Sequence, residues 1–333
     1  MFTVDLTHYH PGSRMYLREI SGREELSASI CDHAATCAWT ADILRCLTLA
    51  VPGGRAADAC WQLSLAARDE VLIALYSHTF GCDIEGQVHC AHCDQTIAMA
   101  FDVATFRTEV ADSAAAAAAR AGELRRLTDR DGFVGTAEIP FRLPTIEDQL
   151  AVAQLPPEQA AEHLLQRCLL SEPTAPLTAN HHADAHNSTD AHNSTDAHNS
   201  TDAHNSTDAH NNAPIDHVAV APARSARTAP RTAPLDDAQR HHLDDAMAAL
   251  APLFDIDVQL SCGACGANQL TRVEIGAHLC RALVREREVL MREVHLLATS
   301  YHWSLAAILQ LPRPQRHRLV SLVQQERSAR WMS

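Results

Sequence analysis

Two short segments, Cys90-Ala91-His92-Cys93 and Cys262-Gly263-Ala264-Cys265, decide how this sequence folds. Each segment spaces two thiols so that both can approach one metal ion from a single turn. An alternating apolar stretch, 97–101, follows the first segment, and another, 256–260, precedes the second. Such alternation is typical of strands with one buried face. We therefore expect each segment to form a knuckle at a strand end, as in a zinc ribbon.

One knuckle supplies only two ligands, so a tetrahedral site needs both knuckles. Four thiolates predict a structural Zn²⁺ with no coordination position left for water. The predicted ligands are Cys90, Cys93, Cys262 and Cys265. This interpretation brings the two halves of the chain together at the metal.

Alternatives to this zinc site stay open in the sequence. The cysteines are independent free thiols, or one pair performs redox chemistry, although a redox C-x-x-C usually begins a helix inside a βαβ unit. His89 and His92 flank the first knuckle, and they are either substitute ligands or exposed loop residues.

A low-complexity segment, residues 171–234, divides the chain. It repeats the hexamer Ala-His-Asn-Ser-Thr-Asp and is then rich in proline, alanine and arginine. Such a segment has no apolar face to bury, so we expect a disordered linker, with metal binding or glycosylation as alternatives. It separates an N-terminal α+β part (1–170), which carries the first knuckle, from a C-terminal part (235–333), which carries the second knuckle and a helical tail.

The rest of the sequence predicts an α+β fold, mainly helical, in which short antiparallel strands form a split zinc-ribbon-like element. Ser21 and Glu24 have the spacing of a capping box at the start of a helix. Asp69 is predicted to cap a helix over residues 71–78. One long helix is expected over 275–301, because apolar residues recur there at helical spacing.

Composition limits the classes of function. The chain of 333 residues carries a formal net charge of −14, which disfavours binding to duplex DNA or anionic membranes. No stretch has the ~20 apolar residues that span a bilayer, and no signal-peptide pattern is present, so we expect a cytoplasmic protein. The P-loop, the nucleophile elbow and the His-Glu-x-x-His motif are also missing. We therefore expect no enzymatic activity.

Several segments stand in a particular order along the chain. They are Ile20–Glu25 (ISGREE), Arg68–Gly81, the first knuckle, Phe141–Thr145 (FRLPT), the second knuckle, Arg292–Leu297 (REVHLL) and Tyr301–Pro312. In this order they resemble the T4-type baseplate protein family of tailed phages and phage-tail-like contractile injection systems. The resemblance covers most of the chain outside the low-complexity segment. It implies a baseplate-hub assembly chaperone that acts by contacts with other baseplate or hub proteins; the acidic charge and the lack of an apolar span separately predict no membrane partner.

The C-terminal block contains the predicted partner-binding residues, Trp303, Tyr301 and Leu311, because aromatic side chains often anchor interfaces. The alternative function is a zinc-ribbon regulatory protein that binds nucleic acid. In its favour, residues 303–311 and the arginine-rich 313–327 loosely resemble a helix-turn-helix. The Leu-Pro turn, the scattered arginines and the acidic charge disfavour this alternative, so nucleic acid is not the expected partner.

Overall fold

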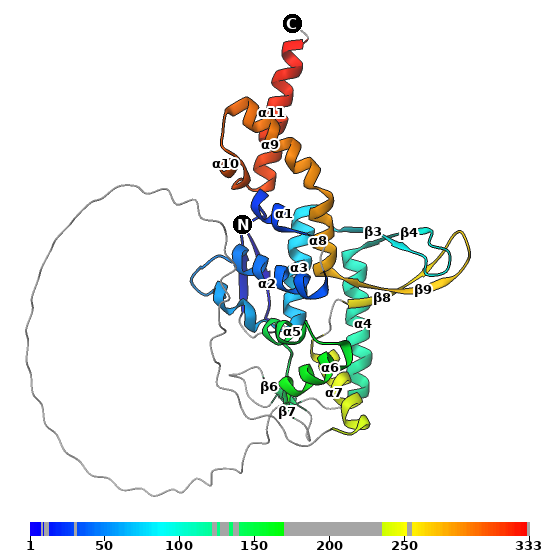
Figure 1. Cartoon of the computed structure of the whole chain (residues 1–333). Helices are drawn as coiled ribbons and strands as arrows, with labels where there is room; N and C mark the ends of the chain where they lie inside the picture. The colour runs from blue at the N-terminus through cyan, green and yellow to red at the C-terminus, as the bar shows by residue number, and fades with distance from the viewer. Residues whose placement is uncertain are drawn as a thin grey trace, which may run out of the picture. The chain divides into compact units, whose positions relative to one another are not determined.

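The computed structural model describes residues 1–7, 9, 13–29, 32–121, 125–126, 133–135, 140–169, 235–251 and 255–331. The predicted disordered linker, 171–234, lies outside the described residues. Met1–Ser171 and Ala229–Ser333 belong to one compact unit. The described part of this unit is mostly helical with short antiparallel strand pairs, as the sequence predicts (Figure 1).

The elements follow one another in this order: β1 (Phe2–Asp5), β2 (Arg14–Leu17), α1 (Gly22–Ser27), α2 (His33–Leu47), the 3-10 helix η1 (Ala57–Gln62), α3 (Leu65–Phe80), β3 (Asp83–His89), β4 (Thr96–Asp102), α4 (Val103–Ala121), β5 (Arg125–Arg126), β6 (Phe133–Gly135), β7 (Pro140–Arg142), α5 (Ile146–Val152), α6 (Pro157–Cys168), α7 (Asp237–Leu250), β8 (Asp255–Ser261), β9 (Asn268–Glu274), α8 (Ile275–Arg285), α9 (Arg287–Tyr301), α10 (Leu305–Leu309) and α11 (Arg313–Trp331). None of the helices in these described ranges has the length and apolar character that crossing a membrane requires.

The main hydrophobic core lies between α2, α3 and α8, beside the β1–β2 hairpin. Leu44 of α2, Leu72 of α3 and Leu279 of α8 are all fully buried in it. Helix α8 follows the predicted linker in the sequence, whereas α2 and α3 precede it. The two flanks of the linker therefore share one core, which does not depend on the knuckles alone.

A second core joins α9, α10 and α11 to α1. Leu290 and Leu297 of α9 pack there with Ile308 of α10 and Val323 of α11. At the start of α1, the Ser21 amide donates to Glu24 Oε2 at 2.9 Å, so the predicted capping box forms. Figure 1 shows these helices together at the end of the molecule that carries the C-terminus.

The single long helix predicted over 275–301 is wrong, because the chain breaks at Glu286 into α8 and α9. Helix α8 packs on α2 and α3, whereas α9 packs on α1, α10 and α11. A straight helix would serve only one of these two cores. The break redirects the chain from one core to the other, and Arg313 Nη2 binds the Glu286 carboxylate at 2.9 Å at the corner.

The predicted cap at Asp69 is also wrong. Helix α3 begins earlier, and Ser64 is its N-cap, with the side chain accepting from the Ala67 amide. Asp69 lies inside the helix, fully buried, and its carboxylate accepts a hydrogen bond from Arg68 Nε at 2.7 Å. A buried carboxylate needs such a partner, which only tertiary packing reveals.

The two knuckle regions have the same architecture: helix, strand, knuckle, strand, helix. Every element of the second region begins 172 residues after its counterpart in the first: Leu65 and Asp237 begin the first helices, Asp83 and Asp255 the first strands, Thr96 and Asn268 the second strands, and Val103 and Ile275 the second helices. The first helix of one region packs on the second helix of the other, as α3 on α8 and α7 on α4. Within the compact unit, the two knuckle regions are therefore arranged as two similar halves that pack against one another.

Candidate metal centre

Each knuckle closes a β-hairpin of the same length. Strands β3 and β4 pair antiparallel from Asp83↔Asp102 to His89↔Thr96, and β8 and β9 pair from Asp255↔Glu274 to Ser261↔Asn268. The two hairpins lie side by side (Figure 1). Their turns therefore present the two C-x-x-C segments at neighbouring tips.

The two knuckles fold alike in detail. The Cys90 amide donates to the Gln95 carbonyl at 2.8 Å, and the Cys262 amide donates to the Ala267 carbonyl at 2.9 Å. The residue after each second cysteine has a left-handed backbone, with φ of 58° at Asp94 and 72° at Gly266. Glycine adopts this conformation freely, and aspartate tolerates it better than most residues. Aspartate therefore replaces glycine in the first knuckle without changing its fold.

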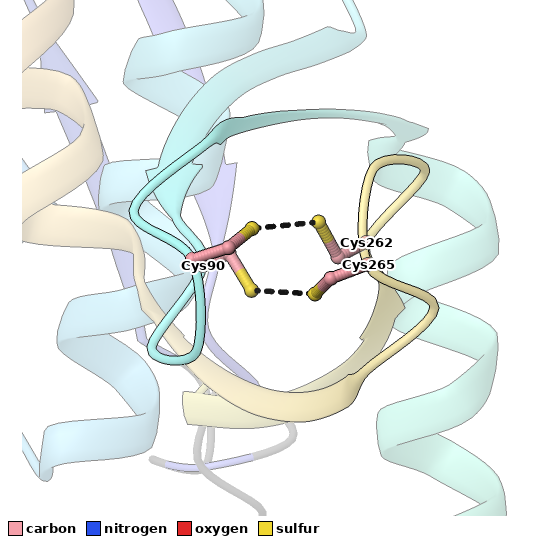
Figure 2. Close-up of side chains that lie close together, drawn as sticks. Cys90, Cys262 and Cys265 are labelled. Carbon is pink, nitrogen blue, oxygen red and sulfur yellow. Dashed lines mark hydrogen bonds between the residues drawn. The ribbon is translucent and has the colours of Figure 1, made fainter.

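The four predicted ligands come together between the two hairpins. The Sγ atoms of Cys90 and Cys265 are 3.7 Å apart, and those of Cys93 and Cys262 are 3.6 Å apart. Figure 2 shows sulfurs from the two knuckles facing one another. All four sulfurs lie within 4.8 Å of each other, close enough to bind one metal ion. Disulfides need about 2.05 Å between sulfurs, so these pairs are not disulfide-bonded.

The electrostatics of the sulfurs also favour a cation. The amides of Cys265 and Ala264 lower the pKa of the Cys262 thiol to about 6, because they donate hydrogen bonds to its sulfur. The Gln95 amide acts likewise on Cys93, but the neighbouring cysteine sulfurs outweigh it and raise the Cys93 pKa to about 12. These hydrogen bonds favour the thiolate form of Cys262, and a negative charge on one sulfur opposes ionisation of the next. A divalent cation at the centre removes this repulsion.

Gln269 fastens one knuckle to the other hairpin without any metal. Its side chain, on β9, accepts from the Ala91 amide at 2.9 Å and donates to the His89 carbonyl at 3.1 Å. The sequence analysis missed this residue, because a glutamine four residues after Cys265 carries no motif. The matched positions of the two hairpins are the one sequence signal that could have drawn attention to it.

The two flanking histidines lie outside the sulfur cluster. His89 and His92 are both exposed, and His89 Nδ1 is 3.7 Å from the Asp94 carboxylate. The cluster of ligand atoms at the knuckles consists of cysteine sulfurs. Cys90 and Cys262 are buried with Ile97 in a small apolar cluster, so these two sulfurs form the inner side of the centre.

The predicted partner-binding residues lie around α10, away from the metal centre. Trp303 is 42% exposed, and Tyr301 stacks on its ring with centroids 5.1 Å apart. Leu311 is half-buried against the α9–α11 core. Leu305, 53% exposed, was missed by the sequence analysis, because helical spacing alone did not show which side of so short a helix faces solvent.

Comparisons of the chain with protein-family models, with curated proteins and with solved structures gave no significant match. The resemblance of its segments to baseplate proteins therefore stays a prediction.

Proposed function

We propose that this protein is a non-enzymatic assembly protein of the baseplate, or baseplate hub, of a phage-tail-like contractile injection apparatus. One observation carries the proposal beyond the order of the segments. Glu25, from the ISGREE segment, and Glu293, from the REVHLL segment, both bind the buried guanidinium of Arg316. Two of the segments that resemble one family thus meet in this fold, where both bind the same buried arginine.

The metal in this proposal is Zn²⁺ in a split zinc-ribbon-like element. Zinc–sulfur bonds of about 2.3 Å in a tetrahedron place sulfurs about 3.8 Å apart. The observed separations of 3.7 and 3.6 Å across the knuckles agree with that spacing. Four thiolates fill the coordination sphere of zinc, so the ion has a structural role and activates no water.

The partner in this proposal is another baseplate or hub protein, bound in the cytoplasm. The contact surface is the exposed pair Trp303 and Leu305. Tyr301 stacks on the indole of Trp303, and Leu311 lies half-buried where this surface meets the α9–α11 core. A rigid aromatic side chain next to an apolar neighbour is a common anchor of protein interfaces. The stacked ring of Tyr301 fixes the orientation of Trp303 before a partner arrives, which lowers the entropy lost on binding.

The alternative, a nucleic-acid binder, is disfavoured by the burial of two arginines at the start of α11. Arg316 is fully buried and bound to two carboxylates. Arg313 is largely buried between Glu25 and Glu286. Phosphate contacts need exposed cations, so these two arginines do not form a basic recognition face.

The proposal is tested first by co-purification of tagged protein with neighbouring baseplate proteins, comparing the wild type with Trp303→Ala. Met291→Ala is the matched control, because Met291 is equally exposed, at 45%, on α9. We expect Trp303→Ala alone to lose the partner while keeping its zinc and its thermal stability. Equal retention of the partner by both variants removes the proposed interface.

Deletion of the gene tests the assembly role itself. We expect incomplete baseplates by electron microscopy, and complementation by Met291→Ala but not by Trp303→Ala. Complete, contractile particles in normal number from the deletion strain contradict the proposal. Normal particles with altered transcription of the cluster support the nucleic-acid alternative instead.

A further inference from the structure

A thiol, an imidazole and a carboxylate meet at a second place, between α2 and the end of β9. Cys37 and His33 stand one helical turn apart on α2, with Cys37 Sγ 3.4 Å from His33 Nε2. Glu274, the last residue of β9, places a carboxylate oxygen 3.6 Å from His33 Nδ1. One ligand atom from each of the three side chains lies within 4.8 Å of the other two.

The backbone around this cluster is fixed by packing. The Asp32 side chain accepts from the Ala35 amide at 2.8 Å, which sets the start of α2 and the position of His33. On the other side, a Cβ added to Gly276 would lie 2.8 Å from Thr40 Cγ2. Glycine therefore allows α8 to approach α2 closely, and this approach brings Glu274 within reach of His33.

The orientation of Glu274 is the second observation. Its counterpart in the first knuckle region is Asp102, which accepts hydrogen bonds from the amides of Ala104 and Thr105 at 2.7 and 3.2 Å and so caps α4. Glu274 stands at the same place before α8 but makes no capping hydrogen bond. Its carboxylate points toward His33 instead. The second knuckle region therefore lacks the side-chain cap that stabilises the start of α4 in the first.

We propose that His33, Cys37 and Glu274 bind a second divalent transition-metal ion of the zinc type. Thiolate, imidazole and carboxylate are all zinc ligands, and a mixed set of this kind suits borderline metals. Tetrahedral bonds of about 2.0–2.3 Å separate ligand atoms by about 3.3–3.8 Å. The two contacts use opposite nitrogens of the His33 ring, so binding one ion requires this 60% exposed ring to rotate and direct one nitrogen toward it.

This second site differs from the knuckle centre in its chemistry. Three protein ligands leave one coordination position, which a water molecule fills. The buried Cys37 thiol forms the floor of the site, and the exposed imidazole forms its solvent side. We therefore expect a metal that exchanges faster than the ion between the knuckles, and that ties α2 to the end of the second hairpin.

The test uses the full chain with zinc in the knuckles. After a weak chelator has removed loosely held metal, Co²⁺ is titrated, and the thiolate-to-cobalt absorption is followed while knuckle zinc is measured. We expect about one further equivalent of metal with a thiolate band at constant knuckle zinc. His33→Gln and Glu274→Gln, both at partly exposed side chains, should lose this equivalent, as should Cys37→Ser. Cys46→Ser is the matched control, since Cys46 is an exposed thiol on the same helix.

Each result decides the question. A band that disappears in His33→Gln and Glu274→Gln but persists in Cys46→Ser supports the site, even if Cys37→Ser fails to fold. Absence of the band in the wild type means that the three groups form only a metal-free hydrogen-bonded set, and it overturns the proposal. A band that survives in both glutamine variants also overturns it.

Discussion

Replacing Arg316 with methionine should lower the free energy of unfolding by about 3 kcal/mol. The side chain is fully buried, with Nη2 2.7 Å from Glu25 Oε1 and Nε 2.6 Å from Glu293 Oε2. Removing one partner of a buried pair costs about 3–5 kcal/mol, because the remaining charge is left unpaired. Glu25 keeps Arg313 at 3.5 Å and Glu293 keeps the His317 ring at 3.1 Å, so we expect the lower end of that range.

Urea unfolding in zinc-containing buffer measures this loss. Arg318→Met is the matched control, because Arg318 is exposed on the same helix two residues away. Exposed substitutions of this kind change stability by less than about 0.5 kcal/mol. A loss below about 1 kcal/mol for Arg316→Met, or equal losses for the two variants, would refute the argument that this guanidinium holds α1, α9 and α11 together.

Other measurements test the remaining parts of the structure. Cys265→Ser, or a strong chelator, should release the knuckle metal and increase hydrogen exchange in the two knuckle hairpins, but not in the main core. Specific cleavage at a protease site inserted after Asp208 should leave the two fragments co-eluting even without metal, because they share the main core. Burial favours a raised pKa at Asp148, but hydrogen bonds from Arg142, Thr145 and Arg167 lower it to about 2. The wild type should therefore lose about 2 kcal/mol from this group as pH falls from 4 to 2, and Asp148→Asn should not. Burial, followed by the charges of nearby arginines, lowers the pKa of His278 to about 4. The folded state thus favours the neutral ring, and wild-type stability should fall by about 3 kcal/mol between pH 6.5 and 4, but not in His278→Phe.

The features that sequence predicts well here are local. A C-x-x-C turn beside an alternating stretch encodes its knuckle within about ten residues, and both knuckles form as expected. The capping box at Ser21 depends only on two side chains three positions apart. The helices of the C-terminal part follow from apolar spacing, apart from the break at Glu286.

The features that sequence did not predict depend on contacts between distant segments. Arg316 looks like a surface cation on a polar helix, and only the approach of Glu25 and Glu293 makes it a buried one. The role of Gln269 depends on where the opposite knuckle lies. The equal spacing of the two knuckle regions was readable in principle, but few residues other than the cysteines are identical between them.

The reciprocal packing of the two knuckle regions explains why the four candidate ligands can lie so far apart in the sequence and still meet in the fold. A zinc ribbon normally draws both knuckles from one short segment, whereas here each region supplies half of the ligands. The first helix of each region also packs against the second helix of the other: α3 packs against α8, and α7 packs against α4. The four sulfurs at the hairpin tips lie close enough to bind one ion, and a shared helical core lies at the base of the same two regions. A metal bound there would fix the hairpins, while the core keeps α8, and with it α9, in place without it.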